Sequence, residues 1–572
     1  MKLIQANRVI ALWFLLFLSS TLTFVNAQQT TIQTDVPAIK DVYKNDFYFG
    51  CLLSYTYIGF PSDPFVPGQS SVTDPNGGYL IQYHMNSMSP GNWLKPVYIV
   101  DLNASAAAYN AAATQAEKDS ADVHPVITFN GNIIAQLNWA QRQGFTFRGH
   151  TLVWHNQTPG TAFFRSGFTT SGARLSKAKM TARLENYIKD VIRTLHEGWP
   201  GLLSAYDVVN EAVNDNGTDR DSSSSEWFKT FKDNSYIMKA FEFARKYTNQ
   251  YGETQIKLYY NDYNTSIAAK ADGIVRVVTP IYQAGYLDGI GMQEHDQYNS
   301  PTAAAWIATY NKFYPICNEM SVTELDVKPS SNTLTNSVLT QQANEYGLLF
   351  KCFVERSAFS GRGKLVSVSK DGLNDARAFV ANASLWDGND QCKPAFYAVV
   401  NVGIYYNKLD SLITYSNNLK ESDYTAQSWS NFSLAFTNAK DARDKQYSYT
   451  NSAPDSLMNA FNDLNEAILN LTDASTSVKD NNRSPKDFIL DQNYPNPFNP
   501  TTNISFTLPQ NSNIHLYLIN MLGQIVKEIA SGNYSAGTHN VNLNASDLAS
   551  GIYCYRLEAG SFAATKKMII MK

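Results

Sequence analysis

The chain has 572 residues, of which 44% are hydrophobic, and a formal net charge of -4 at pH 7. At about 150 residues per domain, this length predicts several domains, although a (β/α)8 barrel alone takes roughly 250 residues. The slightly acidic charge argues against nucleic acid as a partner, because phosphate binding requires a basic surface. The cysteines lack the paired spacing of a zinc site, so we expect no metal, and their odd number leaves at least one thiol unpaired within the chain.

The N-terminus has the features of a secretory signal peptide. Lys2 and Arg8 precede the apolar run Val9 to Leu18, and Val25-Asn26-Ala27 fits a small-residue cleavage site. The apolar run is too short for a transmembrane span, and no later stretch reaches about 18 apolar residues. We therefore expect residues 1–27 to be removed and the mature protein to be exported.

From residue 46 onward, short apolar stretches alternate with amphipathic ones, and a Pro- and Gly-rich loop lies between Pro61 and Gly78. The predicted strands, or strand ends, are 46–53, 83–96, 147–157, 206–212, 256–264, 289–295, 320–326 and 364–369. The predicted helices are 104–122, 130–144, 177–197, 235–250, 268–284, 302–313 and 338–357. About eight alternations of strand and helix are typical of an α/β fold, and we predict a (β/α)8 TIM barrel over residues 28–402.

Two of these strands end in a carboxylate. The apolar run that begins at Tyr206 ends at Asn210-Glu211, and the run that begins at Met320 carries Glu324. Parallel barrels place their chemistry at the C-terminal ends of the strands. Two carboxylates at that end suit glycoside hydrolysis, in which one donates a proton and the other attacks or activates water. Alternatively, each Glu only stabilises the start of the following helix.

Half of the eight histidines also fall at predicted strand ends, namely His84, His150, His155 and His295. A single buried histidine is commonly part of a core. Several at corresponding positions point to a functional site.

Four stretches in order along the chain resemble the family 10 glycoside hydrolases, the retaining endo-β-1,4-xylanases. They are Arg148 to Gln157, Asp207 to Ala212, Gly289 to His295 and Thr323 to Asp326. The resemblance covers roughly residues 40–402. It implies an enzyme that needs no cofactor and that hydrolyses internal β-1,4-xylosidic bonds of plant xylan by double displacement.

The resemblance also implies roles for individual residues. Glu211 would be the general acid/base and Glu324 the nucleophile, with carboxyl groups about 5–5.5 Å apart as retention requires. His295 would hydrogen-bond the nucleophile, Asp326 would orient that imidazole, and Asn210 would contact the sugar 2-hydroxyl. The family's other sugar contacts correspond to Asn92, Lys95, His150, Trp154, Gln157 and Gln293.

The sequence departs from the family pattern at the wall of the site. Gly91 stands where the family has a sugar-binding Glu, Asp371 where it has a Trp, and Phe379 where it has another Trp. Trp93 and Trp386 are candidate replacements for the lost aromatic surface. These departures keep two alternatives open: a substrate that is another β-1,4-glycan or a decorated xylan, or a catalytically impaired xylan-binding protein.

After residue 402 the sequence pattern changes. Residues 403–472 have helical spacing and predict a small bundle, and Tyr424-Thr425-Ala426-Gln427-Ser428-Trp429 resembles the FIVAR-type modules of exported proteins. A structural spacer is the alternative reading of this segment. Residues 473–486 are polar and are predicted to be a linker.

Residues 487–572 predict a β-sandwich, because short apolar–polar alternations such as Ile504, Phe506 and Leu508 are separated by glycines. Tyr494-Pro495-Asn496-Pro497-Phe498 and Gly551-Ile552-Tyr553 resemble the C-terminal sorting domain of the type IX secretion system. This resemblance implies the type IX machinery as a partner, and release from, or attachment to, the outer membrane of a Gram-negative bacterium. We expect the protein to be a monomer. A glycan-binding sandwich is the alternative.

Overall fold

The computed structural model describes residues 32–53, 77–376, 378–474, 488–496, 498, 500–520, 524–548, 551–560 and 562–570. The predicted signal peptide, most of the loop between Pro61 and Gly78, and most of the predicted linker lie outside these residues. No helix among them is long and apolar enough to cross a membrane. The chain divides into two compact units, one ending near Leu471 and the other formed mainly by the C-terminal strands.

A closed barrel of parallel strands forms the centre of the first unit. The strands are β1 (Tyr48–Leu52), β2 (Ser87–Ser89), β5 (Thr146–Trp154), β6 (Leu203–Asn210), β7 (Lys257–Asp262), β8 (Gly289–Met292), β10 (Glu319–Lys328) and β11 (Leu365–Asp371). Each strand pairs with the next in the chain, and β11 pairs with both β10 and β1, which closes the barrel. The predicted (β/α)8 barrel is therefore confirmed.

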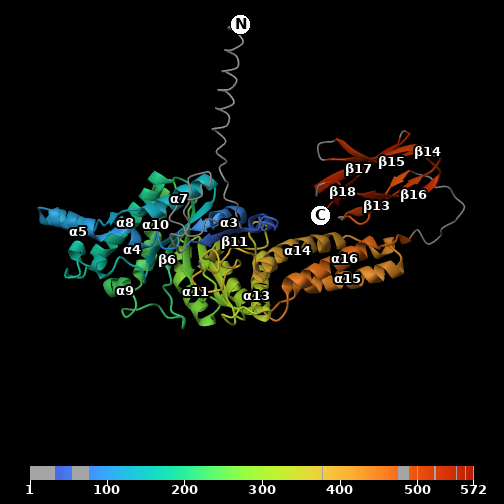
Figure 1. Ribbon diagram of the computed structural model, residues 1–572. Helices are drawn as coiled ribbons and strands as arrows, with labels where there is room; N and C mark the ends of the chain where they lie inside the picture. The colour runs from blue at the N-terminus through green and yellow to red at the C-terminus, as the bar shows by residue number, and fades with distance from the viewer. Residues whose placement is uncertain are drawn as a thin grey trace, which may run out of the picture. The chain divides into compact units, whose positions relative to one another are not determined.

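Helices surround the barrel, as Figure 1 shows for α8, α10, α11 and α13. They are α3 (Gly77–His84), α7 (Gly131–Gln143), α8 (Lys177–Gly198), α10 (Ser235–Gln250), α11 (Ala268–Gln283), α12 (Ala303–Phe313), α13 (Asn336–Val354) and α14 (Pro394–Ser416). Local sequence sets their ends: Asn130 caps the first turn of α7, and Gly144 ends it with φ 67°, a left-handed conformation that suits glycine. On α8, the buried residues Leu184, Ile188 and Val191 recur at helical spacing and face the barrel core.

Shorter elements connect these pieces. They are α2 (Ile39–Val42), α4 (Pro96–Ile99), β3 (Val100–Asp101), α5 (Leu102–Ala111), α6 (Gln115–Ala121), β4 (Val126–Ile127), α9 (Glu226–Phe231) and β9 (His295–Gln297). The Ala-rich stretch predicted as helical over 104–122 forms α5 and α6. In Figure 1, α5 projects from the side of the barrel.

The prediction that His84 lies at a strand end is wrong, because His84 is the last residue of α3. Its imidazole is fully buried, with ring centroids 5.1 Å from Trp386 and 5.2 Å from Phe396. Burial lowers the pKa of His84 to about 3, with a smaller contribution from the charge of Lys40. His84 is therefore a neutral core residue and not part of the carboxylate site.

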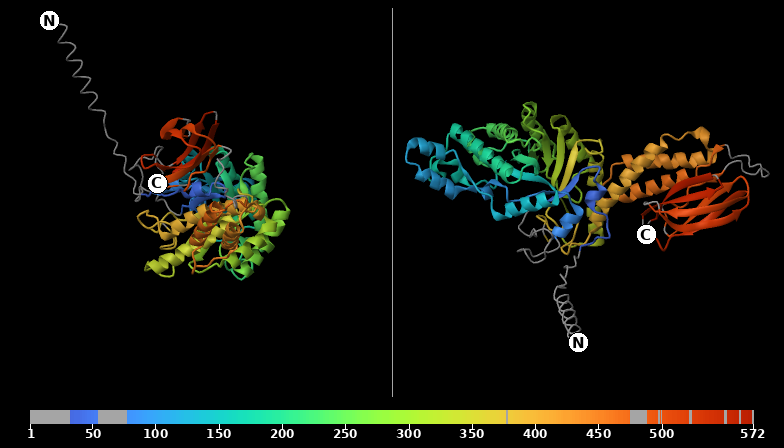
Figure 2. Two further views of the ribbon diagram at one scale, coloured as in Figure 1. Left: turned by 90° about the vertical axis from the view of Figure 1, so that its right-hand side faces the viewer. Right: turned by 90° about the horizontal axis from the view of Figure 1, so that it is seen from above.

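Helix α14 continues from the barrel into the helical segment without a break. It packs on α13, α15 (Ala426–Asp444) and α16 (Ala453–Leu469), and Figures 1 and 2 show α14, α15 and α16 side by side. The boundary predicted at residue 402 falls inside α14. The barrel and the following bundle therefore share one helix.

The second unit consists of antiparallel strands in two sheets. The first sheet holds β12 (Ile489–Leu490), β13 (Thr501–Leu508) and β16 (Gly537–Asn544), and the second holds β14 (Ser512–Ile519), β15 (Ile525–Tyr534), β17 (Gly551–Ala559) and β18 (Phe562–Ile570). Side chains of both sheets form one core, with Phe506 from the first sheet and Leu516 from the second fully buried. This arrangement agrees with the predicted sandwich.

We predict that Gly403→Ala destabilises the first unit by about 1–3 kcal/mol, because the added methyl group overpacks the contact between α2 and α14. A Cβ at Gly403 would lie 2.5 Å from Val42 Cγ1 and 2.7 Å from Tyr43 Cζ. The matched control is Gly198→Ala in α8, where a Cβ meets nothing within 4 Å. Thermal unfolding followed by circular dichroism measures both, and equal melting temperatures would contradict the packing argument.

Candidate active site

The two predicted catalytic carboxylates lie at the same end of the barrel. Glu211 directly follows β6, and Glu324 lies in the C-terminal half of β10. Glu211 adopts φ 54°, a backbone conformation that non-glycine residues rarely adopt, and its N–H donates to the carbonyl oxygen of Asn261 at 2.9 Å. Glu324 is only 8% exposed. The two acids therefore share a partly enclosed site at the C-terminal ends of the strands.

Three side-chain donors surround the Glu211 carboxylate. Trp154 Nε1 donates to Oε2 at 2.9 Å, and Asn210 Nδ2 and Gln293 Nε2 each donate to Oε1 at 3.1 Å. Gln293 also donates to Asn210 Oδ1 at 3.3 Å. These donors orient the carboxyl group and are all uncharged.

Glu324 has a different environment. Asn261 Nδ2 donates to Glu324 Oε1 at 3.0 Å, and His295 Nε2 lies 3.5 Å from Oε2. Burial opposes ionisation of Glu324, but the His295 hydrogen bond and nearby positive charges, Lys95 among them, outweigh it and lower the pKa of Glu324 to about 2. Glu324 is therefore ionised over the whole physiological range.

His295 lies between two carboxylates. Its Nδ1 lies 3.0 Å from Asp326 Oδ2, and its Nε2 faces Glu324. Burial alone would lower the pKa of His295, but the hydrogen bonds and charges of Asp326 and Glu324 raise it well above the ordinary value. The raised pKa favours the protonated ring, whose Nδ1–H donates to Asp326 and whose Nε2–H points toward Glu324.

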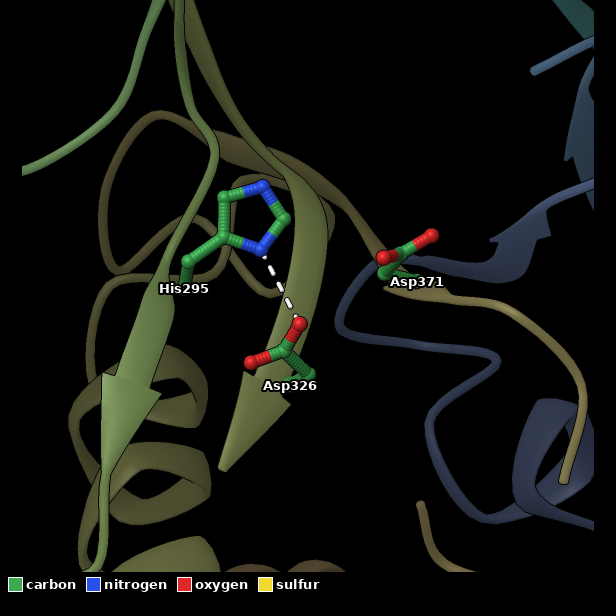
Figure 3. Close-up of side chains that lie close together, drawn as sticks. All are labelled: His295, Asp326 and Asp371. Atoms are coloured by element: carbon green, nitrogen blue, oxygen red, sulfur yellow. Dashed lines mark hydrogen bonds and ion pairs between the residues drawn. The ribbon is translucent and has the colours of Figure 1, made fainter. Parts of the chain in front are cut away.

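Asp371 approaches this pair from β11, as Figure 3 shows. A nitrogen of His295 and one oxygen each of Asp326 and Asp371 lie within 4.8 Å of one another, which is the spacing of metal ligands. Both ring nitrogens of His295 face carboxylates, Nδ1 that of Asp326 and Nε2 that of Glu324. We therefore interpret the three residues as a charge cluster.

The remaining predicted residues adjoin the carboxylates. Lys95 Nζ donates to Asn92 Oδ1 at 2.9 Å and to Gln157 Oε1 at 2.8 Å, and it lies 4.8 Å from the Trp154 ring centroid. Burial lowers the pKa of Lys95, while the charges of Glu324, Glu211 and Asp371 oppose that change. All of the predicted site residues therefore lie in one connected cluster, and their roles remain predictions.

His150 joins this cluster through a buried ion pair that the sequence reasoning did not assign. Its Nδ1 lies 2.9 Å from Asp207 Oδ2, and Arg148 Nε donates to the same oxygen at 3.1 Å. The sequence did indicate that such a pair exists, because Asp207 is a charged residue inside an apolar strand and requires a partner. The sequence reasoning also did not assign Asn261, which donates to both Glu324 and Asn210 Oδ1.

The residues that depart from the family pattern at the wall of the site, and the two tryptophans suggested as replacements, differ in their exposure to solvent. Gly91 has φ 57°, which favours glycine, and Asp371 is buried. Phe379 is 72% exposed, and its ring centroid lies 6.3 Å from that of His295. Trp386 is fully buried against His84, so the suggestion that it replaces a wall aromatic is wrong. Trp93 packs on Tyr98 at 5.1 Å.

A parallel barrel with two carboxylates at the C-terminal ends of its strands is the arrangement of a barrel-type glycoside hydrolase. Comparison with known families agrees, since the family described as glycosyl hydrolase family 10 matches residues 38–402. The chain belongs to this family. A second family, described as a secretion system C-terminal sorting domain, matches residues 492–571.

Among curated proteins, the chain is 32% identical to endo-1,4-beta-xylanase Y of Acetivibrio thermocellus over 66% of its length and 33% of that protein. It is 35% identical to the bifunctional endo-1,4-beta-xylanase XylA of Ruminococcus flavefaciens over 57% of its length and 31% of that protein. The chain thus spans about a third of the length of these relatives.

Among solved structures, the chain resembles the CBM22-1-GH10 modules of Clostridium thermocellum endo-1,4-beta-D-xylanase 10B, complexed with xylohexaose. The TM-score is 0.53 and the identity 32%, over 64% of this chain and 67% of that chain.

We predict that Asp326→Asn lowers the pKa of His295 and raises the pKa of Glu324, because Asp326 makes the main hydrogen bond that holds the imidazolium. The raised pKa of His295 stabilises the fold below about pH 6.5, and this contribution is lost as pH rises through the folded value. The lowered pKa of Glu324 stabilises the fold above the ordinary glutamate pKa of 4.5, and this contribution is lost as pH falls toward about 2.

Loss of one partner of a buried pair should cost about 3 kcal/mol at neutral pH. NMR titration of the imidazole and urea unfolding measure the two effects. Glu253→Gln, which removes a carboxylate 2.7 Å from His196 outside the site, is the control. An unchanged His295 titration in Asp326→Asn would refute the proposed coupling.

Proposed function

We propose that the chain is a secreted retaining endo-1,4-β-xylanase that hydrolyses internal bonds of xylan by double displacement. The observation that carries the proposal is the different environment of the two acids. Glu324 is held ionised by His295 and Asn261, while the donors that the structure describes around the Glu211 carboxyl are uncharged. The names of the relatives, endo-1,4-beta-xylanases, support the choice of substrate.

In this mechanism the Glu324 carboxylate attacks the anomeric carbon while Glu211 gives its proton to the departing glycosidic oxygen. The covalent bond removes the negative charge of Glu324. Glu211, now a carboxylate, then takes a proton from water, which attacks the anomeric carbon and releases Glu324. Retention requires the carboxyl groups to be about 5–5.5 Å apart.

The surrounding residues bind the sugar and orient the acids. Asn210 donates to the sugar 2-hydroxyl, a bond that strengthens in the transition state. His295, held by Asp326, keeps Glu324 oriented. The sugar contacts are Asn92, Lys95, His150, Trp154, Gln157 and Gln293. The enzyme requires no cofactor, because proton transfer and nucleophilic attack use side chains alone.

The C-terminal unit directs the protein to the secreted or cell-surface compartment, as its sorting-domain match indicates. We further propose that the type IX machinery of a Gram-negative bacterium exports it after removal of residues 1–27, and that it acts as a monomer.

A second candidate keeps the mechanism but changes the substrate to another β-1,4-glycan or a decorated xylan. The observation that favours it is Asp371, a buried carboxylate beside His295 and Asp326 where the family pattern has an aromatic wall. A polar wall accepts hydrogen bonds from hydroxyl groups, whereas an aromatic wall packs on the sugar ring.

We predict that Glu324→Ala and Glu211→Ala each lower reducing-sugar release from xylan by at least about 10³-fold. NMR of the first product formed should show the β anomer. Glu242→Ala, which removes a carboxylate paired with Lys239 on α10, should leave activity unchanged. Full activity in Glu324→Ala would refute the nucleophile, and xylan binding without turnover in the parent would select the impaired binding protein.

Asp371→Asn tests the altered wall. The charge of Asp371 helps to keep Lys95 protonated, so its removal lowers the pKa of Lys95. We expect KM for xylan to begin rising at a lower pH than in the parent, by a few tenths of a pH unit. Identical pH profiles of KM would show that Asp371 has no influence on the sugar contacts.

A further inference from the structure

A second groove lies at the opposite end of the barrel from the carboxylates. It has a volume of about 880 Å³ and lies between the α2–β1 connection, the segment before β11, and α14. Tyr48, which opens β1, lines the groove and pairs with Ser367, whereas Leu52 at the other end of β1 pairs with Asp371. Four residues of strand separate these ends by about 13 Å. A ligand in the groove therefore lies outside the catalytic site.

Two exposed aromatic side chains meet in this groove. Tyr48 is 38% exposed and Phe359 is 45% exposed, and their ring centroids lie 5.0 Å apart with an interplanar angle of 82°. The edge of one ring thus meets the face of the other, and both rings keep solvent-exposed surface. Sugar rings pack their C–H faces on such surfaces. The pair therefore suits a carbohydrate ligand.

The acidic residue of the groove is already neutralised. The Asp46 carboxylate accepts from Ser357 Oγ at 3.0 Å, Arg362 at 3.2 Å and Asn407 Nδ2 at 2.9 Å. Arg362 also donates to Asp410 at 2.9 Å. This network makes a rigid polar wall and leaves no uncompensated negative charge on Asp46.

The cations of the groove are different. Lys44 and Lys408 both line it with exposed side chains, and neither forms an ion pair with any residue that the structure describes. Lys408 Nζ lies 5.5 Å from the Tyr405 ring centroid and 5.6 Å from the Phe461 ring centroid. The unpaired charge in the groove is therefore positive. This favours a ligand that carries carboxylates.

We propose that the groove binds xylan that carries uronic-acid side groups, as a second glycan site remote from the catalytic residues. A sugar of the β-1,4-linked main chain packs on Tyr48 and Phe359, and the uronate carboxylate binds Lys44 and Lys408. The inference rests on the proposed function for its choice of polymer. The groove holds the enzyme on acidic regions of the polysaccharide while the catalytic site cuts another stretch.

The test is affinity electrophoresis of the full chain in gels that contain soluble glucuronoxylan, with Glu324→Ala in all variants so that the polymer stays intact. Tyr48→Ala combined with Phe359→Ala should weaken retardation about tenfold in apparent Kd, as expected for loss of two ring contacts. Lys44→Ala combined with Lys408→Ala should weaken it on glucuronoxylan but not on the same polymer after reduction of its carboxyl groups. Tyr314→Ala, which removes an aromatic with the same 45% exposure outside the groove, is the control.

Equal retardation of the parent and the Tyr48/Phe359 variant would overturn the site. If the lysine variant lost the same retardation on the acidic and on the reduced polymer, the proposal that the ligand is acidic would be overturned. Failure of the proposed function is seen separately, as absence of hydrolysis of short xylo-oligosaccharides by the chain with Glu324 intact. Tyr48→Ala combined with Phe359→Ala in the chain with Glu324 intact should leave hydrolysis of these short substrates at the parent rate, and thermal unfolding shows that this variant is folded.

Discussion

The burial of several carboxylates at one end of the barrel is the constraint on which the rest of the site depends. An ionised carboxylate in a dry site is costly unless it is paired, and Asp207, Glu324 and Asp326 each have a basic side chain beside them. Asp207 binds Arg148 and His150, and His295 lies between Asp326 and Glu324. These pairings determine which acid stays ionised, so the chemistry follows from the way the charges are compensated.

Strand register determines which polar side chains meet in the middle of the site. Asn210 pairs with Asn261, which in turn pairs with Gly291. A Cβ at Gly291 would lie 2.3 Å from Asn261 Oδ1, so the glycine leaves the room in which the amide turns toward Asn210 and Glu324. The hydrogen bonds from Asn261 to Asn210 and Glu324 thus depend on the register of three neighbouring strands, β6, β7 and β8.

This dependence explains what the sequence could predict. The alternation of apolar strands and amphipathic helices predicted the barrel, and the position of Glu211 and Glu324 at strand ends predicted that they meet. Asn261 also lies near a strand end, but its importance arises from cross-strand register and could not be predicted from its own strand. The prediction for His84 was wrong because the helix that begins at Gly77 continues through His84, into the start of the predicted strand at 83–96. Likewise, nothing in the local sequence around Trp386 shows that tertiary packing buries its indole beneath α14.

Because α14 is continuous across residue 402, the chain cannot be divided there without cutting a helix. A recombinant fragment that stops at residue 402 would cut this helix in its middle and remove the Gly403 turn that lies on Val42 and Tyr43. The truncation would also delete Tyr406, Leu409 and Ile413, which are buried core residues in the second half of α14, the helix that packs on α16. A fragment that keeps α14 whole therefore extends through Ser416, and one that also keeps the packing of α14 on α16 extends through Leu469.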